Sequence, residues 1–150
     1  MAINIAINGA AGRMGRCLIQ AVAETDGLHL SAAIDRPESS LIGVDAGELA
    51  GVGKLGVILS ADLDMATQQS DIIIDFTIPE ATMALLPLCA RNQCRPVIGT
   101  TGFDEAQKQL IQQTADNIAT LLAPNMSVGV NLSLKLLDMA ARVLGDSVDI

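Results

Sequence analysis

Apolar residues in the first third of the chain follow two different periods, and together they predict a strand, a helix and a second strand. Residues 3–7 form a short, mostly apolar run, which is typical of a buried strand. From about Arg13 to Thr25 the apolar residues recur every three or four positions, so this segment is expected to be an amphipathic helix that ends before Gly27. A second apolar run, from Leu28 to Ile34, predicts the next strand.

The remainder of the chain repeats this alternation. Residues 71–76 are mostly β-branched and lack alternating polar positions, which favours a strand buried inside a parallel sheet. Further strands are expected at 57–60, 95–98 and 118–122, and further helices at 61–69, 77–92, 104–117 and 128–144. Strands that alternate with helices predict an α/β fold, with a doubly wound parallel sheet of the Rossmann type and helices on both faces.

Local signals add detail to these elements. Ser60 is expected to cap the helix that follows it, and Thr77 is expected to cap the next helix with Glu80 at the capping-box position. The helix at 128–144 is apolar on most faces, and such helices are normally buried. Residues 37–56 are rich in glycine and are expected to be irregular, forming either a lid over a ligand or a variable surface excursion.

Composition and charge exclude several classes of partner. The 150 residues carry a formal net charge of −8 and no cluster of Lys and Arg, so nucleic acid is not an expected partner. The chain shows no signal peptide and no long uncharged apolar run, so we expect a cytoplasmic protein without membrane contact. Its three cysteines are expected to be small core residues, His29 is expected at the surface, and no metal site is predicted.

Three glycines, Gly9, Gly12 and Gly15, separate the first expected strand from the first expected helix with the spacing G-x-x-G-x-x-G. A strand, a glycine turn and a helix N-terminus in this order let backbone amides approach a pyrophosphate, and the helix dipole favours the anion. We therefore expect this turn to bind the phosphates of a dinucleotide. A tight turn without any ligand is the alternative that the pattern leaves open.

The ends of the expected strands carry small, polar or charged residues, as the ligand edge of an open parallel sheet does. Asp35 lies 20 residues after Gly15, at the end of the second strand, where an acid accepts hydrogen bonds from the adenosine ribose of NAD. Its neighbour Arg36 is suited to the 2′-phosphate of NADPH, because a guanidinium matches phosphate oxygens in a bidentate geometry. The pair predicts the use of both NADH and NADPH, although a solvated Asp-Arg turn before Pro37 would have the same sequence.

Four segments together give the chain a resemblance to a known family. They are residues 9–15 (GAAGRMG), 75–77 (DFT), 97–103 (VIGTTGF) and 123–131 (APNMSVGVN). In sequence and mutual spacing they resemble the bacterial 4-hydroxy-tetrahydrodipicolinate reductases, also called dihydrodipicolinate reductases, of the diaminopimelate route to lysine. The resemblance implies that a small cyclic imine dicarboxylate is reduced by hydride transfer from NADH or NADPH.

The resemblance also implies a set of cofactor-binding residues. From the pyrophosphate to the adenosine and then the nicotinamide end, these are Gly9, Ala10, Ala11, Gly12, Arg13 and Met14, then Asp35 and Arg36, then Phe76 and Thr77, then Gly99, Thr100 and Thr101, and finally Ala123, Pro124, Asn125 and Met126. Of these residues, Thr101 is expected to lie close to the substrate. Asp35 and Met126 stand where many family members carry Glu and Phe, and neither difference removes a donor or charge that the cofactor needs.

The substrate-binding segment of the family, of the form H-H-x-x-K-x-D-A-P-S-G-T, is expected beyond Ile150, so no catalytic residue is assigned in this chain. Residues 1–126 are expected to form the NAD(P)-binding domain, and residues 127–150 a helix that leads into a substrate-binding and tetramerisation domain. We therefore expect the chain to bind the dinucleotide without turnover, and the complete enzyme to be a homotetramer. Another Rossmann-type amino-acid-pathway dehydrogenase and a non-catalytic dinucleotide-binding module stay open as alternatives.

Overall fold

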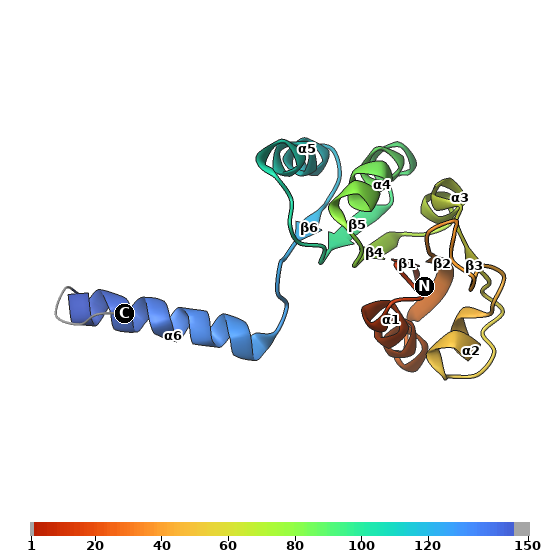
Figure 1. Ribbon diagram of the computed structural model, residues 1–150, viewed down its shortest axis with the longest axis horizontal. Helices are drawn as coiled ribbons and strands as arrows, with labels where there is room; N and C mark the ends of the chain where they lie inside the picture. Colours follow the sequence, from red (N-terminus) through yellow and green to blue (C-terminus); the bar gives the residue numbers. More distant parts are fainter. Residues whose placement is uncertain (1, 146–150) are drawn as a thin grey trace.

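A six-stranded sheet organises the structure, a computed structural model that describes residues 2–145 (Figure 1). Its strands are β1 (Ile3–Asn8), β2 (Leu28–Ile34), β3 (Leu59–Ser60), β4 (Ile72–Asp75), β5 (Arg95–Ile98) and β6 (Leu121–Leu122). The helices are α1 (Arg13–Glu24), α2 (Ala46–Ala50), α3 (Leu63–Gln68), α4 (Pro79–Asn92), α5 (Glu105–Ala115) and α6 (Val128–Leu144). The strands pair in parallel in the order β3-β2-β1-β4-β5-β6, which confirms the predicted doubly wound α/β fold.

The strand order shows where a ligand site is expected. From the central strand β1 the chain moves outward to β2 and β3, returns to β4 on the other side of β1, and then moves outward again to β5 and β6. The direction of winding therefore changes between β1 and β4, whose last residues, Asn8 and Asp75, are paired. In open parallel sheets, ligands bind beyond the carboxyl ends of the strands at such a point.

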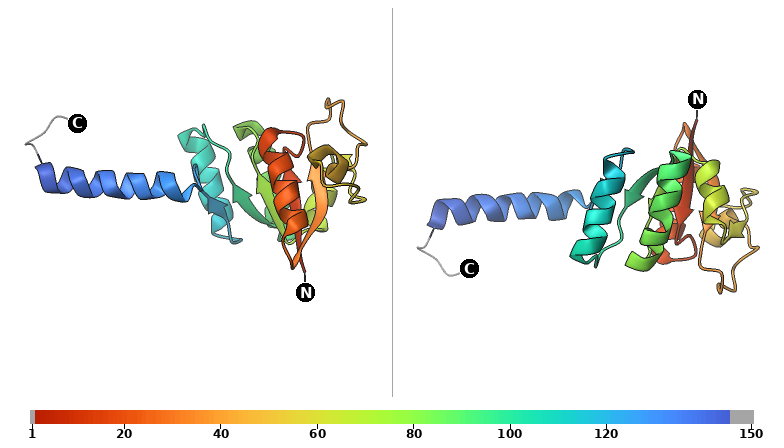
Figure 2. Two further views of the ribbon diagram at one scale, coloured as in Figure 1. Left: turned by 90° about the horizontal axis from the view of Figure 1, so that it is seen from below. Right: turned by 90° about the horizontal axis from the view of Figure 1, so that it is seen from above.

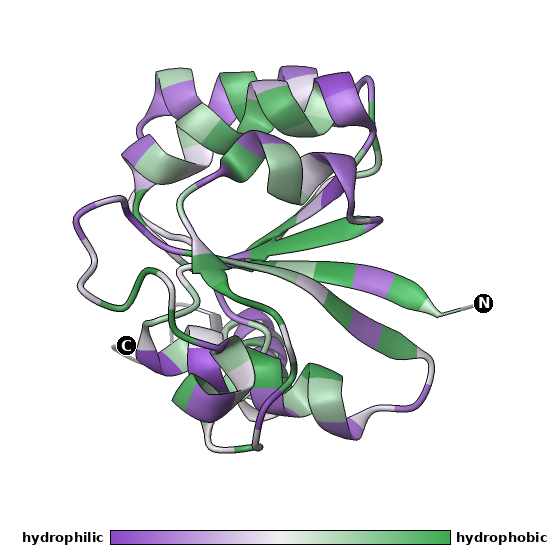
Figure 3. Ribbon diagram, turned by 90° about the vertical axis from the view of Figure 1, so that its right-hand side faces the viewer, coloured by the Kyte–Doolittle hydropathy of each residue, from purple (hydrophilic) through white to green (hydrophobic). Residues whose placement is uncertain are grey.

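Helices cover the two faces of the sheet in separate layers (Figure 3). Ile5 and Ile7 of β1 join a buried cluster with residues of α1 and α2, whereas Ala6 joins a second cluster with residues of α3 and α4. This division follows from the two-residue period of a strand, whose successive side chains point to opposite faces. The centre of β1 is consequently buried on both sides, and this explains its apolar sequence.

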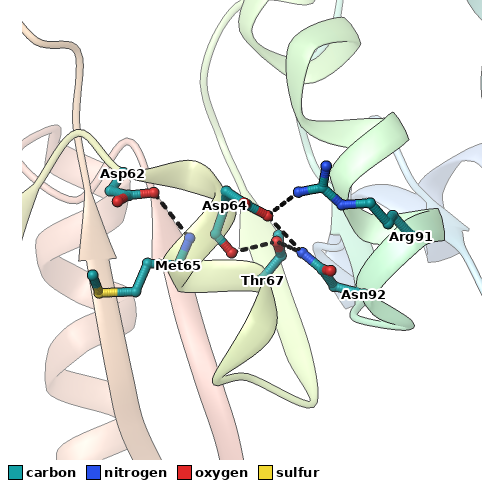
Figure 4. A network of polar contacts seen from close by, with 6 residues as sticks. All are labelled: Asp62, Asp64, Met65, Thr67, Arg91 and Asn92. Carbon is teal, nitrogen blue, oxygen red and sulfur yellow. Dashed lines mark hydrogen bonds and ion pairs between the residues drawn. The ribbon is translucent and has the colours of Figure 1, made fainter.

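Polar contacts join α3 to α4 (Figure 4). The carboxylate of Asp64 accepts a hydrogen bond from Asn92 at 2.9 Å, and it forms an ion pair with Arg91. Asn92 also donates to the hydroxyl of Thr67 at 2.8 Å. The hydrogen bonds from Asn92 and Arg91 lower the pKa of Asp64, because they favour its ionised form.

Helix α3 begins later than the sequence predicts, and its expected cap is wrong. The carboxylate of Asp62 accepts the amide of Met65 at 2.9 Å and thereby caps the helix. The hydroxyl of Ser60 instead accepts the amide of Asp62 at 3.0 Å, within the turn that precedes the helix. The carboxylate of Asp62, and not the hydroxyl of Ser60, therefore caps the helix.

Helix α4 begins at Pro79, but its predicted capping box of Thr77 and Glu80 is wrong. Ile78 occupies the cap position, and no side chain there forms a capping hydrogen bond. The hydroxyl of Thr77 donates to the buried carboxylate of Asp75 at 2.7 Å. Thr77 therefore belongs to the carboxyl edge of the sheet rather than to the helix.

The segment 37–56 is more ordered than the sequence predicts. It contains helix α2, and an antiparallel bridge joins Asp45 to Ile58 beyond its end. Asp45 is buried, and its carboxylate accepts hydrogen bonds from the amides of Gly47, Glu48, Leu55 and Gly56. Residues 37–41 line a cavity described below, so part of this segment belongs to the wall of the candidate site.

The predictions for single cysteines and for the histidine have mixed outcomes. Cys89 and Cys94 are buried, as predicted, and His29 is exposed, as predicted. Cys17 is exposed, so the prediction that it is a core residue is wrong. The reason is the orientation of α1, whose buried face is formed by Gly15, Ile19 and Val22.

Helix α6 projects away from the sheet and the helices that cover it (Figures 1 and 2). None of its residues is buried, so the prediction that this helix is buried is wrong for the chain by itself. Leu132, Leu136 and Met139 are 57%, 56% and 63% exposed. The end of the segment predicted as 127–150 lies outside the described residues. No helix between residues 2 and 145 is long and apolar enough to cross a membrane.

Candidate functional site

A cavity of about 800 Å³ opens at the carboxyl ends of β1, β2 and β4. Its volume lies in the range of pockets that hold cofactors and other small molecules. Residues 37–41 form the part of its wall that follows β2. The predicted site residues in its wall are Gly9, Ala11, Gly12, Asp35, Arg36, Phe76 and Thr77.

A second cavity, of about 470 Å³, lies against the first turn of α1. It is lined by Arg13, Met14 and Gly15, together with residues that include Gly12 and Phe76. Gly12 and Phe76 also line the first cavity, so the two cavities adjoin at the N-terminus of α1, and together they are called the groove below. The structure therefore brings together the predicted phosphate-binding turn and the predicted adenosine-binding residues.

The amides of the glycine turn, residues 9–12, are already hydrogen-bonded within the protein. The first two donate to the carbonyl oxygen of Ile34, at 2.9 Å each, and the last donates within the turn at 3.0 Å. The amide of Ala11 donates to the carboxylate of Asp35 at 2.9 Å. The donors left for an anion are therefore the amides of residues 13–15, because the first amides of a helix have no acceptor within it.

Gly12 and Gly15 differ in how much room the surrounding atoms leave for a side chain. A Cβ at Gly15 would lie 2.2 Å from the carbonyl oxygen of Gly9, so the packing of α1 against the turn excludes a side chain there. A Cβ at Gly12 would lie 3.2 Å from the same oxygen, and the φ of Gly12, −70°, is ordinary for any residue. Alanine at position 12 therefore requires this oxygen to shift by a few tenths of an ångström, a much smaller conflict than at position 15. Gly12 also lines both cavities, so an added side chain would take up space at the groove.

Asp35 lies in the wall of the first cavity, and its carboxylate is held in place by the backbone. One oxygen accepts the amide of Ala11 at 2.9 Å, and the other accepts the amide of Arg36 at 2.8 Å. A carboxylate offers about four lone-pair positions, so both oxygens can still accept hydrogen bonds from hydroxyl groups. Arg36 is exposed and lines the same cavity, as does Glu38, an acidic neighbour that the sequence analysis did not single out.

Two residues at the end of β4 contact two residues that follow β5. The ring of Phe76 packs so closely on Gly99 that a Cβ at position 99 would lie 2.2 Å from ring carbons. The amide of Thr77 donates to the hydroxyl of Thr100 at 2.9 Å. Gly99 and Thr100 are buried and support the wall of the groove from behind, whereas Thr101 is exposed.

The last predicted group, Ala123–Met126, lies apart from the groove. The amide of Ala123 donates to the carbonyl oxygen of Ile98 at 3.0 Å, which places this residue at the end of β5. The next three residues are exposed, and the side chain of Asn125 accepts the amide of Ser127 at 2.8 Å in the turn before α6. None of the group lines either of the two cavities.

Asp75 is the residue of this sheet edge that the sequence analysis assigned no role. It is fully buried, and its carboxylate accepts hydrogen bonds from the side chains of Asn8, Thr77, Thr82 and Thr100. The sequence does contain a feature that points to Asp75, because an acidic residue ends an otherwise apolar strand. The same feature identified Asp35 as a candidate site residue.

The polar groups of the groove fit an organic ligand that carries phosphate and hydroxyl groups. Backbone amides and two Arg side chains suit the phosphates, and the carboxylate of Asp35 suits hydroxyl donors. In the described part of the chain, no group of three or more His, Cys, Asp or Glu residues is arranged to hold a metal ion.

Comparison with known proteins agrees with this geometry. The family described as dihydrodipicolinate reductase, N-terminus, matches residues 3–126. A curated 4-hydroxy-tetrahydrodipicolinate reductase of Alkalilimnicola ehrlichii is 55% identical over 150 residues, which cover all of this chain and 56% of that protein. The chain thus spans about half the length of this curated relative.

Solved structures give the same result. The dipicolinate-bound dihydrodipicolinate reductase from Paenisporosarcina sp. TG-14 matches with a TM-score of 0.73 and 28% identity, over 94% of this chain and 54% of that one. Saccharopine dehydrogenase of Saccharomyces cerevisiae matches with a TM-score of 0.69 and 16% identity, over 94% of this chain and 32% of that one, and this likeness concerns the fold alone. The chain belongs to the dihydrodipicolinate reductase family, through the match of residues 3–126 to the N-terminal part of that family.

Proposed function

We propose that the groove binds a nicotinamide dinucleotide, NADH or NADPH, and that the complete protein uses it to reduce 4-hydroxy-tetrahydrodipicolinate. Family membership and the 55% identical reductase support this proposal. The observation that carries it is Gly12. Alanine at this position requires the turn to shift by only a few tenths of an ångström, and the glycine lines both cavities where they adjoin.

In this proposal the N-terminus of α1 binds the pyrophosphate. The amides of residues 13–15 donate to the phosphate oxygens, and the side chain of Arg13 adds positive charge. Asp35 accepts hydrogen bonds from the adenosine ribose, and Arg36 pairs with the 2′-phosphate of NADPH. Phe76 supplies an apolar surface where the two cavities adjoin.

The nicotinamide end is assigned to two groups of residues on the basis of the family resemblance. Residues 99–101 and 123–126 follow β5 and β6, and the exposed Thr101 is placed nearest to the substrate. A bound nicotinamide supplies the hydride that reduces an imine-type carbon. The task of the protein residues is to hold the ring in a fixed orientation, because hydride transfer requires the reacting atoms to be aligned.

The domain assignment is part of the same proposal. Residues 1–126 form the cofactor domain, and residues 127–150 lead into the substrate-binding part of the complete protein. The β-sheet and the groove both lie within the first of these ranges, which supports the boundary. The dicarboxylate substrate, the homotetramer and the cytoplasmic location stay predictions.

The Gly12→Ala variant tests the proposal. Calorimetric titration should show that the chain binds NADH and NADPH, and that the variant binds both at least about tenfold more weakly, a loss of about 1.4 kcal/mol. The free energy of unfolding should stay within about 1 kcal/mol of the wild type, because alanine only replaces a glycine at a helix cap.

Gly15→Ala is the matched control, since it adds the same methyl group where it does not fit. We expect it to lower both the affinity and the free energy of unfolding, the latter by about 1–3 kcal/mol, as overpacking does. If Gly12→Ala binds the dinucleotides as tightly as the wild type, the groove is not their site.

A further inference from the structure

A buried carboxylate joins the strand ends behind the groove. One oxygen of Asp75 accepts hydrogen bonds from Asn8 at 2.9 Å and Thr77 at 2.7 Å. The other accepts hydrogen bonds from Thr82 at 2.5 Å and Thr100 at 3.3 Å. A buried polar group is costly unless it is hydrogen-bonded, and here each oxygen of the carboxyl group accepts two donors. The sequence therefore retains an ionisable group at a fully buried position by surrounding it with neutral donors.

These four donors come from four parts of the fold, and two of them lie at the groove. Asn8 ends β1 and Thr77 follows β4, and both line the first cavity. The hydroxyl of Thr100, which donates to Asp75, also accepts the amide of Thr77 at 2.9 Å. Both the side chain and the backbone of Thr77 are therefore fixed by contacts that run through Asp75.

We infer that Asp75 is a positioning residue of the dinucleotide site. It holds Thr77 in the wall of the groove, and through Thr100 it holds the turn that follows β5. Asp75 itself lines neither cavity, so it acts through these neighbours rather than by contact with the ligand. The inference rests on the proposed function, because it concerns the same groove.

A purely structural role for Asp75 predicts a different outcome. Its bond to Thr82 fastens α4 to β4, and a role limited to this contact would change only the stability of the fold. A positioning role also changes the affinity for the dinucleotide, and it does so through Thr77. The two roles are therefore distinguished by comparing variants that lose a similar amount of stability. Only a positioning role predicts that their affinities for the dinucleotide differ.

The test uses Asp75→Asn in the whole chain. Asparagine keeps the shape of the side chain but turns one acceptor oxygen into a donor, so the two hydrogen bonds at that position can no longer form in their original direction. We expect the Kd for NADH to rise about tenfold, because small displacements at a site cost large factors in binding and rate. Leu85→Ala is the matched control, since Leu85 is fully buried on α4 and its truncation destabilises the core without touching the polar network. Its Kd should stay within about twofold of the wild type.

A double-mutant cycle with Thr77→Val tests the route of the effect. If Asp75 acts through Thr77, Asp75→Asn should change the Kd by less than about threefold in the Thr77→Val background, because effects on a shared contact are not additive. Full additivity overturns the inference. So does an unchanged Kd for Asp75→Asn alone, or an equal rise in Kd for Leu85→Ala.

A milder variant keeps the test valid if Asp75→Asn does not fold. Thr100→Val removes the hydroxyl that joins Asp75 to the amide of Thr77, and we expect a larger rise in Kd than for Leu85→Ala despite a smaller loss of stability. An equal or smaller rise overturns the inference. If the wild-type chain does not bind NADH, both the proposed function and this inference are wrong. If the wild-type chain binds NADH tightly and Asp75→Asn does not change the Kd, only the inference is wrong.

Discussion

Asp35 and Arg36 place opposite charges side by side at one end of the groove. Because Arg36 is exposed, water and salt screen part of its attraction for a phosphate. We expect Arg36→Ala to weaken NADPH binding about tenfold, as the loss of one charge-assisted pair does. Binding of NADH, which lacks the 2′-phosphate, should change by less than about twofold. Parallel titrations of the two dinucleotides measure the difference.

Lys54→Ala is a suitable control for this change, since it removes the same charge from an exposed position outside both cavities. It should leave the ratio of the two affinities as in the wild type. Equal losses for NADH and NADPH in Arg36→Ala would show that this side chain does not contact the 2′-phosphate.

At this scale the sequence predicts Asp35 but not the role of Asp75. The position of Asp35 follows from one glycine turn, one helix and one strand of ordinary length, so spacing along the chain is sufficient. The role of Asp75 depends on Asn8, Thr82 and Thr100, which come from three other elements. Contacts between residues so far apart in the chain cannot be read from local patterns.

At the scale of elements, Asp45 holds helix α2 and the turn that follows it. The amide of Leu55 is the main cause of a pKa below the usual value of 3.8, and three further amides act in the same direction. Because the pKa is lower in the folded state, the ionised form adds stability above about pH 4, and this contribution is lost as the pH falls through the folded-state pKa. Asp45→Asn should therefore lower the Tm at pH 7 and flatten its decline between about pH 5 and 3.

Asp62→Asn is the comparison for this experiment, because Asp62 is exposed and its carboxylate caps α3 by accepting the amide of Met65. It should change the dependence of Tm on pH much less than Asp45→Asn does. A wild-type pH dependence in Asp45→Asn would mean that this carboxylate does not stabilise the folded segment.

The existence of the longer elements is predicted well, and their ends less well. Strands β2 and β5 and helix α6 have the predicted bounds, because hydrophobic periodicity is a local property of the sequence. Helix α2 was missed because its five residues are too few to show a helical period. The caps of α3 and α4 were missed because Asp62 and Ser60 compete for one position, and because a distant carboxylate binds the hydroxyl of Thr77.

At the scale of the whole molecule, α6 exposes a large apolar surface. Leucine, valine and methionine side chains along the entire helix are accessible, and exposed apolar patches of this kind favour association. We expect the mass of the 150-residue chain to rise with concentration in light scattering coupled to gel filtration. Replacing Leu132 and Leu136 by lysine should reduce this association, because each change removes apolar area and adds charge.

Ser133→Lys provides the control, since it adds a charge to the same exposed helix without removing an apolar side chain. Its association should lie close to that of the wild type. A chain that stays monomeric at high concentration would contradict the prediction. Hydrophobicity alone predicted a buried helix, because it shows that a surface tends to be covered but not what covers it.

The glycine turn, finally, has a consequence for the dynamics of ligand binding. Its four amides are hydrogen-bonded before any ligand is present, so the turn loses little conformational freedom when a dinucleotide enters. In deuterium exchange, the amides of residues 9–12 should be protected in the free protein. Those of residues 13–15 should exchange rapidly until NADH is added and slowly afterwards. Rapid exchange throughout the turn before binding would show that the ligand, and not the fold, orders this loop.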